Sequence, residues 1–272
     1  MASPKYGQID RDYAIRLATI SPEEDGPIWM VNLMKYHDVA QYGDEAAQKV
    51  SGREADNLYT PLEPLAAVGA EIVYVGDVDS KLLGDDRNWD RVAVVKYPTR
   101  RSFVEMQQRE DFQKKHVHKE AGMQETIVMG CLPVDLSSMQ GSLPDWEDVE
   151  YPATKEDGPI VALHVLKFHS DIVIGETSEE MAEYTKKASE VALKHGVRIS
   201  GWFGVEGTIV GDGRQWDQVW FNAFPSKAAF MAVVKDSERL KAQETLREGL
   251  IMDTYILVVR TTNDNLAVSI VA

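Results

Sequence analysis

Two blocks of this sequence occur twice, in the same order. Residues 26–38 (GPIWMVNLMKYHD) match residues 158–170 (GPIVALHVLKFHS) at five of thirteen positions. Residues 84–92 (GDDRNWDRV) match residues 211–219 (GDGRQWDQV) at six of nine positions, including a Trp-Asp pair. A repeat of this length constrains the fold more than any local signal, because each copy must form a similar structural unit. We therefore predict a tandem duplication.

A polar, acidic segment separates the two copies. Residues 135–157 contain two prolines and no apolar periodicity, as expected for a surface connection. The predicted organisation is an N-terminal extension (1–21), a first unit (22–134), a linker (135–153), a second unit (154–262) and a C-terminal tail (263–272). The tail, which includes NLAVSIVA, could add an edge strand.

Each copy has the same predicted order of elements, strand–helix–strand–strand–helix–strand. Each begins with an apolar run in which neither alternating face is polar, which is typical of a strand buried on both sides. The first copy is predicted to contain strands 28–36, 70–76, 89–97 and 126–132 and helices 54–68 and 99–115. The second is predicted to contain strands 160–168, 197–203, 216–224 and 254–260 and helices 178–195 and 226–247.

The ends of the first helix in each copy carry specific signals. Gly69 and Gly196 follow the two helices, and glycine is the residue preferred at that position. Ser178 is a suitable cap for the second of them. The helix of the first copy contains Pro61 and Pro64, so we expect a break there.

The order βαββαβ is that of a ferredoxin-like unit. Four antiparallel strands with both helices on one face leave the other face of the sheet bare and apolar. Two such units can bury these faces against each other. We therefore expect an α+β protein in which two tandem ferredoxin-like units pack sheet to sheet as an internal pseudo-twofold α+β barrel.

The charge balance excludes two classes of partner. The chain has 29 basic and 44 acidic residues, a formal net charge of −15 and a pI near 4.8. Such a surface repels nucleic-acid phosphates and anionic lipid headgroups. We expect no nucleic acid and no membrane as partners. A small-molecule substrate remains, and a homodimer of the duplicated chain is compatible with the sequence.

Cysteine use and the chain start predict a cytoplasmic location. Cys131 is the single cysteine, so no intrachain disulfide can form, as expected in a reducing compartment. No apolar run approaches the ~20 residues that a membrane-spanning helix needs. The N-terminus lacks the apolar stretch of a signal peptide, and we interpret it as part of the mature chain.

Several strings of the first copy resemble a known bacterial family. They are VNLMKY, SGREADNLY at 51–59, WDRVAVVKYPT and HKEA at 118–121. They resemble the domain of unknown function 1330, within the dimeric α+β barrel superfamily. The resemblance implies a late His-Arg pair, for which this chain has His118 and Lys119. The second copy keeps Arg247 but has Leu246 in place of the histidine, and it lacks the element at 51–59.

The resemblance implies a fold more than a reaction. The superfamily includes cofactor-free monooxygenases, cyclases, lyases, isomerases, haem enzymes and degenerate structural copies. A fold of this kind does not specify its chemistry. The substrate therefore has to be inferred from the site.

Asn32 is a polar residue within the first apolar strand, and His164 takes its place in the second copy. A buried amide without a hydrogen-bond partner costs about 1–3 kcal/mol. It is either tied to a neighbouring backbone group or it lines a pocket and orients a ligand oxygen. The difference between the copies favours a pocket, because one copy can keep a site while the other diverges.

His118 is the candidate for proton transfer. Histidine titrates near neutral pH and serves as general acid or base. The alternative is a histidine that complements the dipole at the end of its helix. His116 lies about 200° around a regular helix from His118, so the two cannot hold one metal ion.

The Gly-Asp-x-Arg-x-Trp-Asp block occurs in both copies, which favours a structural role. If one copy is a site, Arg87 suits a carboxylate and Trp89 could wall a pocket. Arg214 and Trp216 are their counterparts in the second copy.

Known signatures of phosphate, dinucleotide, zinc and serine-hydrolase sites are missing from the sequence, and we expect no metal and no organic cofactor. We predict a small cofactor-independent enzyme of the lyase, isomerase or cyclase type, acting on a hydrophobic or aromatic oxygenated metabolite. The alternatives are a non-catalytic binding or structural protein and a cofactor-free monooxygenase. Asn32 and His118 are the predicted catalytic residues. The predicted substrate contacts are Met30, Met34, Tyr36, Glu54, Tyr59, Arg87, Trp89, Phe103 and Met106.

Overall fold

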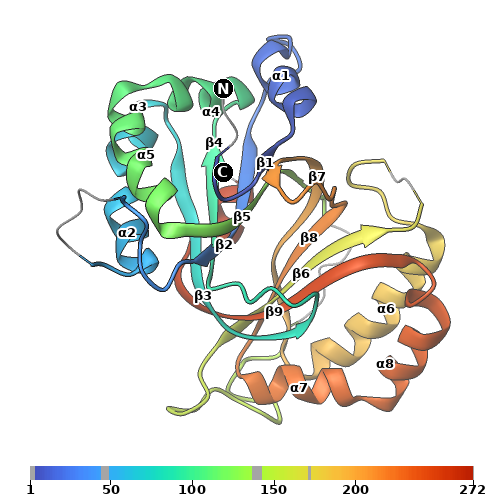
Figure 1. Cartoon of the computed structure of the whole chain (residues 1–272). Coiled ribbons are helices and arrows are strands. Elements are labelled where there is room, and N and C mark those ends of the chain that lie inside the picture. Colours follow the sequence, from blue (N-terminus) through green and yellow to red (C-terminus); the bar gives the residue numbers. More distant parts are fainter. Residues whose placement is uncertain (1–3, 44–48, 137–142, 171–172, 272) are drawn as a thin grey trace. The chain divides into compact units, whose positions relative to one another are not determined.

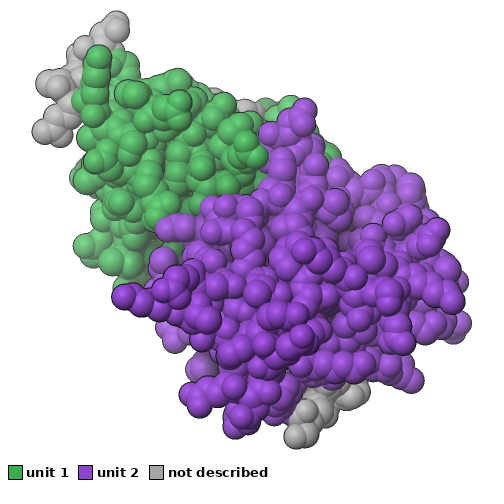
Figure 2. Space-filling view, turned by 90° about the horizontal axis from the view of Figure 1, so that it is seen from below, with its two compact units in different colours: residues 1–75, 88–131, 206–215 green, residues 76–87, 132–205, 216–272 purple. Residues whose placement is uncertain are grey.

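A computed structural model describes residues 4–43, 49–136, 143–170 and 173–271. The chain forms two compact units, coloured separately in Figure 2. Unit 1 comprises Met1–Val75, Asn88–Cys131 and Glu206–Gln215, and unit 2 comprises Gly76–Arg87, Leu132–Val205 and Trp216–Ala272. Each unit therefore includes a segment from the other sequence copy. The predicted domain boundaries stay a prediction, and parts of the predicted extension (1–3), linker (137–142) and tail (272) lie outside the described residues.

The first series of elements supplies most of unit 1. Its strands are β1 (Gln8–Ile9), β2 (Ile28–Tyr36), β3 (Glu71–Leu83), β4 (Arg91–Tyr97) and β5 (Met123–Pro133). Its helices are α1 (Arg11–Thr19), α2 (Gly52–Tyr59), α3 (Leu62–Ala67), α4 (Arg100–Gln108) and α5 (Glu110–Gly122). In Figure 1 the helices α2 to α5 lie together beside the strands of this unit.

The second series supplies most of unit 2. Its strands are β6 (Ile160–Phe168), β7 (Arg198–Gly211), β8 (Gln218–Phe224) and β9 (Ile251–Asp264). Its helices are α6 (Glu179–Lys194), α7 (Lys227–Lys235), α8 (Ser237–Ala242), a π-helical turn (Gln243–Arg247) and α9 (Leu266–Val271). The C-terminal tail was expected to add an edge strand, and it forms α9 instead.

The predicted fold, two ferredoxin-like units packed sheet to sheet, is wrong. Within the described residues the strands form one nine-stranded sheet in the order β1-β7-β5-β2-β4-β3-β9-β6-β8. β7 also pairs with β8, so eight of these strands make one closed antiparallel β-barrel. The mixture of α and β elements is as expected.

The length of two strands explains this difference. β3 has 13 residues and β7 has 14, whereas β4 and β8 have 7 each. The boundary between the units falls within both long strands, at Val75/Gly76 and Val205/Glu206. The predicted ends of these strands, at residues 76 and 203, are wrong. The extra residues instead continue the ladder, with β3 between β4 and β9 and β7 between β5 and β8.

The helix signals in the sequence correspond to local geometry. Gly69 and Gly196 have positive φ angles of 72° and 79°, and the Ser178 side chain accepts a hydrogen bond from the Met181 amide. The predicted break near the prolines is confirmed, because α2 ends at Tyr59 and α3 begins at Leu62. Polar groups on α2 and apolar groups on α3 can therefore face the strands at different angles.

Strand register places two polar residues at equivalent positions. In unit 1, Asn32 of β2 lies opposite Ala93 of β4 and Val128 of β5. In unit 2, His164 of β6 lies opposite Trp220 of β8. Next to these positions the units differ in side-chain size, because Ala93 of unit 1 corresponds to Trp220 of unit 2.

Candidate active site

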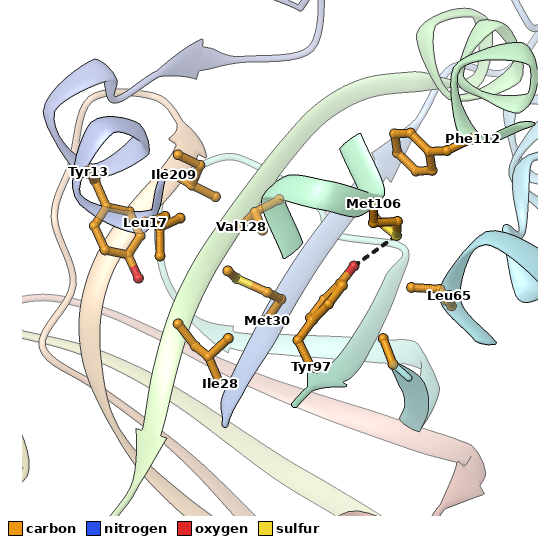
Figure 3. Packing of buried hydrophobic residues seen from close by; sticks show 11 residues of the cluster. Tyr13, Leu17, Ile28, Met30, Leu65, Tyr97, Met106, Phe112, Val128 and Ile209 are labelled. Atoms are coloured by element: carbon orange, nitrogen blue, oxygen red, sulfur yellow. Dashed lines mark hydrogen bonds between the residues drawn. The ribbon is translucent and has the colours of Figure 1, made fainter. Parts of the chain in front are cut away.

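A cavity of about 170 Å³ lies in unit 1 between the β2–β4–β5 face and the helices α2 to α5. Apolar side chains make most of its wall: Met30, Leu65, Tyr97, Met106, Phe112 and Val128 belong both to the lining and to one packed cluster. Figure 3 shows these side chains, and its dashed line marks the Tyr97 hydroxyl hydrogen-bonded to Met106 Sδ at 3.2 Å. An engineered cavity of about 150 Å³ holds benzene, so this one has room for one aromatic ring.

Six of the residues predicted for the site line this cavity: Met30, Asn32, Met34, Tyr59, Phe103 and Met106. They come from β2, α2 and α4. The structure therefore brings the polar position of the first strand together with the apolar residues that were expected around it.

Three other predicted residues lie outside the lining. The Tyr36 hydroxyl donates to Asp56 Oδ2 at 2.6 Å. Glu54 is exposed and completes a capping box with Ser51 at the start of α2. His118 Nδ1 lies 2.7 Å from the Tyr42 hydroxyl, with the two rings edge to face at 5.6 Å. None of these contacts places the residue against the cavity, and the catalytic assignment of His118 stays a prediction.

The Gly-Asp-x-Arg-x-Trp-Asp blocks form turns. Arg87 pairs with Asp85 at 2.6 Å, and Arg214 pairs with Asp212 at 2.7 Å. The tryptophans of both blocks, Trp89 and Trp216, are 3% exposed. All four side chains lie outside the cavity lining of their units.

Lys119 is a charged residue of this cavity in an unusual, largely buried environment. The residue is 9% exposed, and its Nζ lies 5.4 Å from the ring centre of Tyr6 and 5.2 Å from that of Tyr59. No hydrogen bond or ion pair of this ammonium occurs among the described residues. Burial lowers the pKa of Lys119, and the charges of Asp56 and Glu120 oppose that shift. In its ammonium form this group lies against the faces of the two rings, with no hydrogen-bond acceptor among the described residues.

His116 lies one turn before Lys119 on α5 and lines the same cavity. Its Nε2 is 3.3 Å from the Tyr6 hydroxyl and 3.5 Å from Glu120 Oε1, while its Nδ1 is buried without a partner in the described part of the chain. Burial and the Lys119 charge lower the pKa of His116, against the effect of Glu120. The imidazole is therefore neutral near pH 7 and able to accept a proton.

Asn32 keeps hydrogen-bonding capacity for a ligand. Its Nδ2 donates to the Met30 carbonyl on the same strand at 2.9 Å. This is the backbone tie considered as an alternative to a pocket role. Neither Oδ1 nor the second N–H of the amide has a partner among the described residues. Both interpretations therefore apply to the same side chain.

A buried ion pair borders the cavity next to Asn32. Asp56 Oδ2 accepts from Tyr36 and from Arg91 Nη1 at 3.0 Å, and the side chains of Asp56 and Arg91 are 7% and 14% exposed. The hydrogen bond to Asp56 adds to burial in raising the pKa of Tyr36. The Arg91 charge is balanced within the protein, in contrast with that of Lys119.

The cavity residues that were not predicted from the sequence include Tyr6, Asp56, Arg91, His116 and Lys119. The helical period was sufficient to find two of them, because Phe112, His116 and Lys119 recur at spacings of four and three and so share one face of α5. His118 lies on another face of that helix. Tyr6 lies 110 residues before His116 in the chain, and no local pattern links the two.

Unit 2 has a smaller cavity of about 110 Å³ at the equivalent strand positions. It is lined by His164, Trp202 and Trp220, and the indole N–H groups of both tryptophans donate to Gln218 Oε1. Burial, together with the Arg247 and Arg239 charges, lowers the pKa of His164 to about 3. Arg247, the counterpart of Lys119, lies 5.8 Å from the Tyr184 ring and is not part of this lining.

Two further features are missing from the described segments. No group of three or more His, Cys, Asp or Glu side chains in these segments is arranged to hold a metal ion. No helix among them has the length and apolar character needed to cross a membrane.

The comparisons with known proteins found similarity in structure. No protein-family model and no curated protein matches the sequence. The resemblance to the domain of unknown function 1330 therefore stays a prediction.

Three kinds of solved structure are similar to the chain. The RPA0582 protein of unknown function from Rhodopseudomonas palustris is 22% identical over 48% of this chain and 98% of its own, with a TM-score of 0.41. A candidate monooxygenase from Fusobacterium nucleatum is 10% identical over 89% of this chain and 97% of its own, with a TM-score of 0.47. A mutant chlorite dismutase from Candidatus Nitrospira defluvii is 10% identical over 96% of this chain and all of its own, with a TM-score of 0.50.

At 10% identity the likeness to chlorite dismutase shows the fold alone.

Proposed function

We propose that the unit 1 cavity is the active site of a small enzyme that moves a proton on a hydrophobic or aromatic oxygenated metabolite. One observation carries this proposal: an apolar cavity of ring size contains Asn32, Tyr59 and His116, each with hydrogen-bonding capacity that the described residues leave unused. A mostly apolar pocket with a few convergent polar groups is typical of small-molecule sites. A lyase, isomerase or cyclase reaction fits this composition.

His116 and Tyr6 are suited to remove a proton together. With Nε2 as acceptor, the Tyr6 hydroxyl donates to His116 across 3.3 Å. A proton leaving the substrate passes to the Tyr6 oxygen as the hydroxyl proton passes to Nε2. This leaves neutral tyrosine and an imidazolium, and Glu120 at 3.5 Å stabilises the latter. Return of the proton at another atom completes an isomerisation, and loss of a leaving group completes an elimination.

Asn32 supplies the polar contact at the strand side of the cavity. Its free N–H can donate to a substrate carbonyl or enolate oxygen, while the bond to Met30 fixes the side chain. Electrostatic stabilisation of a developing oxyanion by a fixed donor contributes about 2.7–4 kcal/mol in a known hydrolase. Substitution of Asn32 is therefore expected to slow proton removal more than it weakens binding.

Solvent deuterium exchange tests the proposal without a known substrate. A panel of single-ring aryl ketones and aryl carboxylates with acidic C–H groups is incubated with protein in D₂O, and proton NMR monitors loss of the C–H signal. Exchange by the wild type and by His118→Gln, together with its loss in His116→Gln, supports the proposed roles. Exchange lost only in His118→Gln would instead support the histidine chosen from sequence.

Two outcomes contradict an enzyme. Ligands that bind to the cavity without accelerated exchange at any position would favour a non-catalytic binding protein. Exchange that persists in Ala93→Trp, which fills the cavity, would place the chemistry elsewhere. Ala93→Leu serves as the milder variant if the tryptophan disturbs folding.

A further inference from the structure

The charges that line the unit 1 cavity do not cancel. Asp56 and Arg91 form an ion pair, with Nη1 3.0 Å from Oδ2. Lys119 is the remaining formal charge in the lining, because His116 is neutral near pH 7. No carboxylate among the described lining residues is left to pair with Lys119, and Glu120, whose charge also acts on Lys119, lies outside the lining.

The described residues around Lys119 attract its ammonium group but leave its hydrogen-bond donors without acceptors. The faces of the Tyr6 and Tyr59 rings attract the ammonium, yet they accept none of its three hydrogen bonds. Asp56 accepts from Tyr36 and pairs with Arg91, and Glu120 accepts from the Lys5 amide. Neither carboxylate forms an ion pair with Lys119 among the described residues. A buried charge without a partner is costly, so such groups in proteins are paired or bind a ligand.

Resting on the proposed function, we infer that the substrate of this cavity carries a carboxylate on an apolar body about the size of one aromatic ring, and that the Lys119 ammonium binds this carboxylate. The carboxylate would form an ion pair with the Lys119 ammonium and accept hydrogen bonds from its N–H groups. The apolar body would lie against Met30, Met106 and Phe112. An oxygen function would then reach Asn32.

The second copy provides an internal contrast. Arg247 stands at the position of Lys119, but it lies outside the unit 2 cavity lining. Trp220 stands where unit 1 has Ala93, and the cavity that remains is about 110 Å³. The unit 2 lining contains a cation of its own, Arg239, but its guanidinium donates to the Val234 carbonyl and to Gln243 Oε1. The Lys119 ammonium has no such acceptor among the described residues, so the carboxylate site is assigned to unit 1.

Matched ligands of different charge test this assignment. Phenylacetate and phenylacetamide have nearly the same shape, and their affinities are measured by ligand-observed NMR with the full chain. Wild type is expected to bind phenylacetate at least ~10-fold more tightly, the range of a hydrogen bond to a charged group. Lys119→Met should remove this preference, with the amide affinity within ~2-fold, and Lys119→Arg should keep most of it. An unchanged amide affinity also shows that Lys119→Met remains folded.

The possible failures are distinguishable. Equal binding of both ligands by wild type, or a carboxylate preference that survives in Lys119→Met, overturns the inference about Lys119. If that equal binding is also lost in Ala93→Trp, the proposed site stands and the carboxylate class is rejected. Absence of binding of either ligand at millimolar concentration overturns both the inference and the site.

Discussion

The cavities of units 1 and 2 occupy equivalent strand positions and are lined by different side chains. Opposite the polar residue of the first strand in each copy, unit 1 has Ala93 and unit 2 has Trp220. The larger side chain accompanies the smaller cavity, about 110 Å³ against about 170 Å³. The smaller residue of the repeated strand thus goes with the larger cavity.

The two cavities also differ in how their polar groups are satisfied. In unit 2 the indole N–H groups converge on the Gln218 side chain, whose own amide donates to the Glu176 carbonyl and to Thr177. In unit 1 the corresponding position, Arg91, is paired with Asp56, while Asn32 and Lys119 retain unused donors. Unit 2 also keeps unused groups, because His164 Nδ1 and Thr185 Oγ1 in its lining are buried without a partner among the described residues. The units therefore differ in which groups are left unused: an amide and an ammonium in unit 1, and an imidazole nitrogen and a hydroxyl in unit 2.

Substitution of Trp220 or Ala93, the residues opposite His164 and Asn32, should have the largest effect on stability. Trp220→Ala is expected to cost about 3–5 kcal/mol in the free energy of unfolding, because a buried ring is replaced by a void. Ala93→Trp is expected to cost less, about 1–3 kcal/mol, because the unit 1 cavity accepts part of the ring. Denaturant titration of both variants measures this, and equal costs would show that the cavity of unit 1 is not open space.

Removal of the Tyr36 hydroxyl should be the next largest effect. Tyr36→Phe copies Phe168 of the second copy and deletes a buried bond to the Asp56 carboxylate, at an expected cost of about 1.5–3 kcal/mol. Tyr97→Phe is the matched control, since that hydroxyl contacts only the Met106 sulfur, and its expected cost is about 0.5 kcal/mol. A similar loss in both variants, measured by denaturation, would contradict a special role for Asp56.

His164 of unit 2 predicts an acid dependence at a strand position where unit 1 has Asn32, which does not titrate. The pKa of His164 is about 3 in the folded chain and near 6.5 in the unfolded chain, so only the unfolded chain gains a proton as the pH falls between these values. The stability present above pH 6.5 is therefore lost toward pH 3, by about 2 kcal/mol between pH 7 and pH 5.

His164→Asn, which copies Asn32, should remove this part of the pH dependence. The measurement is the difference in unfolding free energy between wild type and the variant at each pH. A difference that stays constant from pH 7 to pH 5 would show that His164 is already protonated, or is solvated, in the folded chain.

Loss of the capping box that Ser51 forms with Glu54 should have the smallest effect on stability. Ser51→Ala breaks the capping box of α2 and is expected to cost about 1 kcal/mol. Ligand affinity should be unchanged, because the cap lies outside the cavity lining. A loss of affinity above ~3-fold in the NMR titration would instead support Glu54 as a substrate contact.

Local features of the fold were predictable from the sequence. The first strand of each copy, β2 and β6, has the predicted bounds, because an apolar run between polar turns specifies both ends. The glycines after the first helices and the proline break are equally local. The lengths of β3 and β7 were not predicted correctly, because polar residues such as Asp77 and Glu206 do not reveal that a strand continues beside a distant partner.

The candidate site shows the same division. Asn32 and the methionines around it were predictable, because alternation along a strand decides which residues share a face. The choice of His118 over His116 depended on which side of α5 faces the strands, and that is decided by packing against Tyr59 and Phe112. The role proposed for Lys119 was not predictable from the sequence, because the sequence does not show which carboxylates pair with other residues.

The most direct test of a ligand site confined to unit 1 is a crystal structure with 4-bromophenylacetate, located by the anomalous signal of bromine. We predict one bromine site in unit 1 among Met30, Met106 and Phe112, with the carboxylate within hydrogen-bonding distance of Lys119 Nζ. We also predict no site beside Trp220 in unit 2. A bromine in the unit 2 cavity with none in unit 1, or a carboxylate turned away from Lys119, would contradict this assignment.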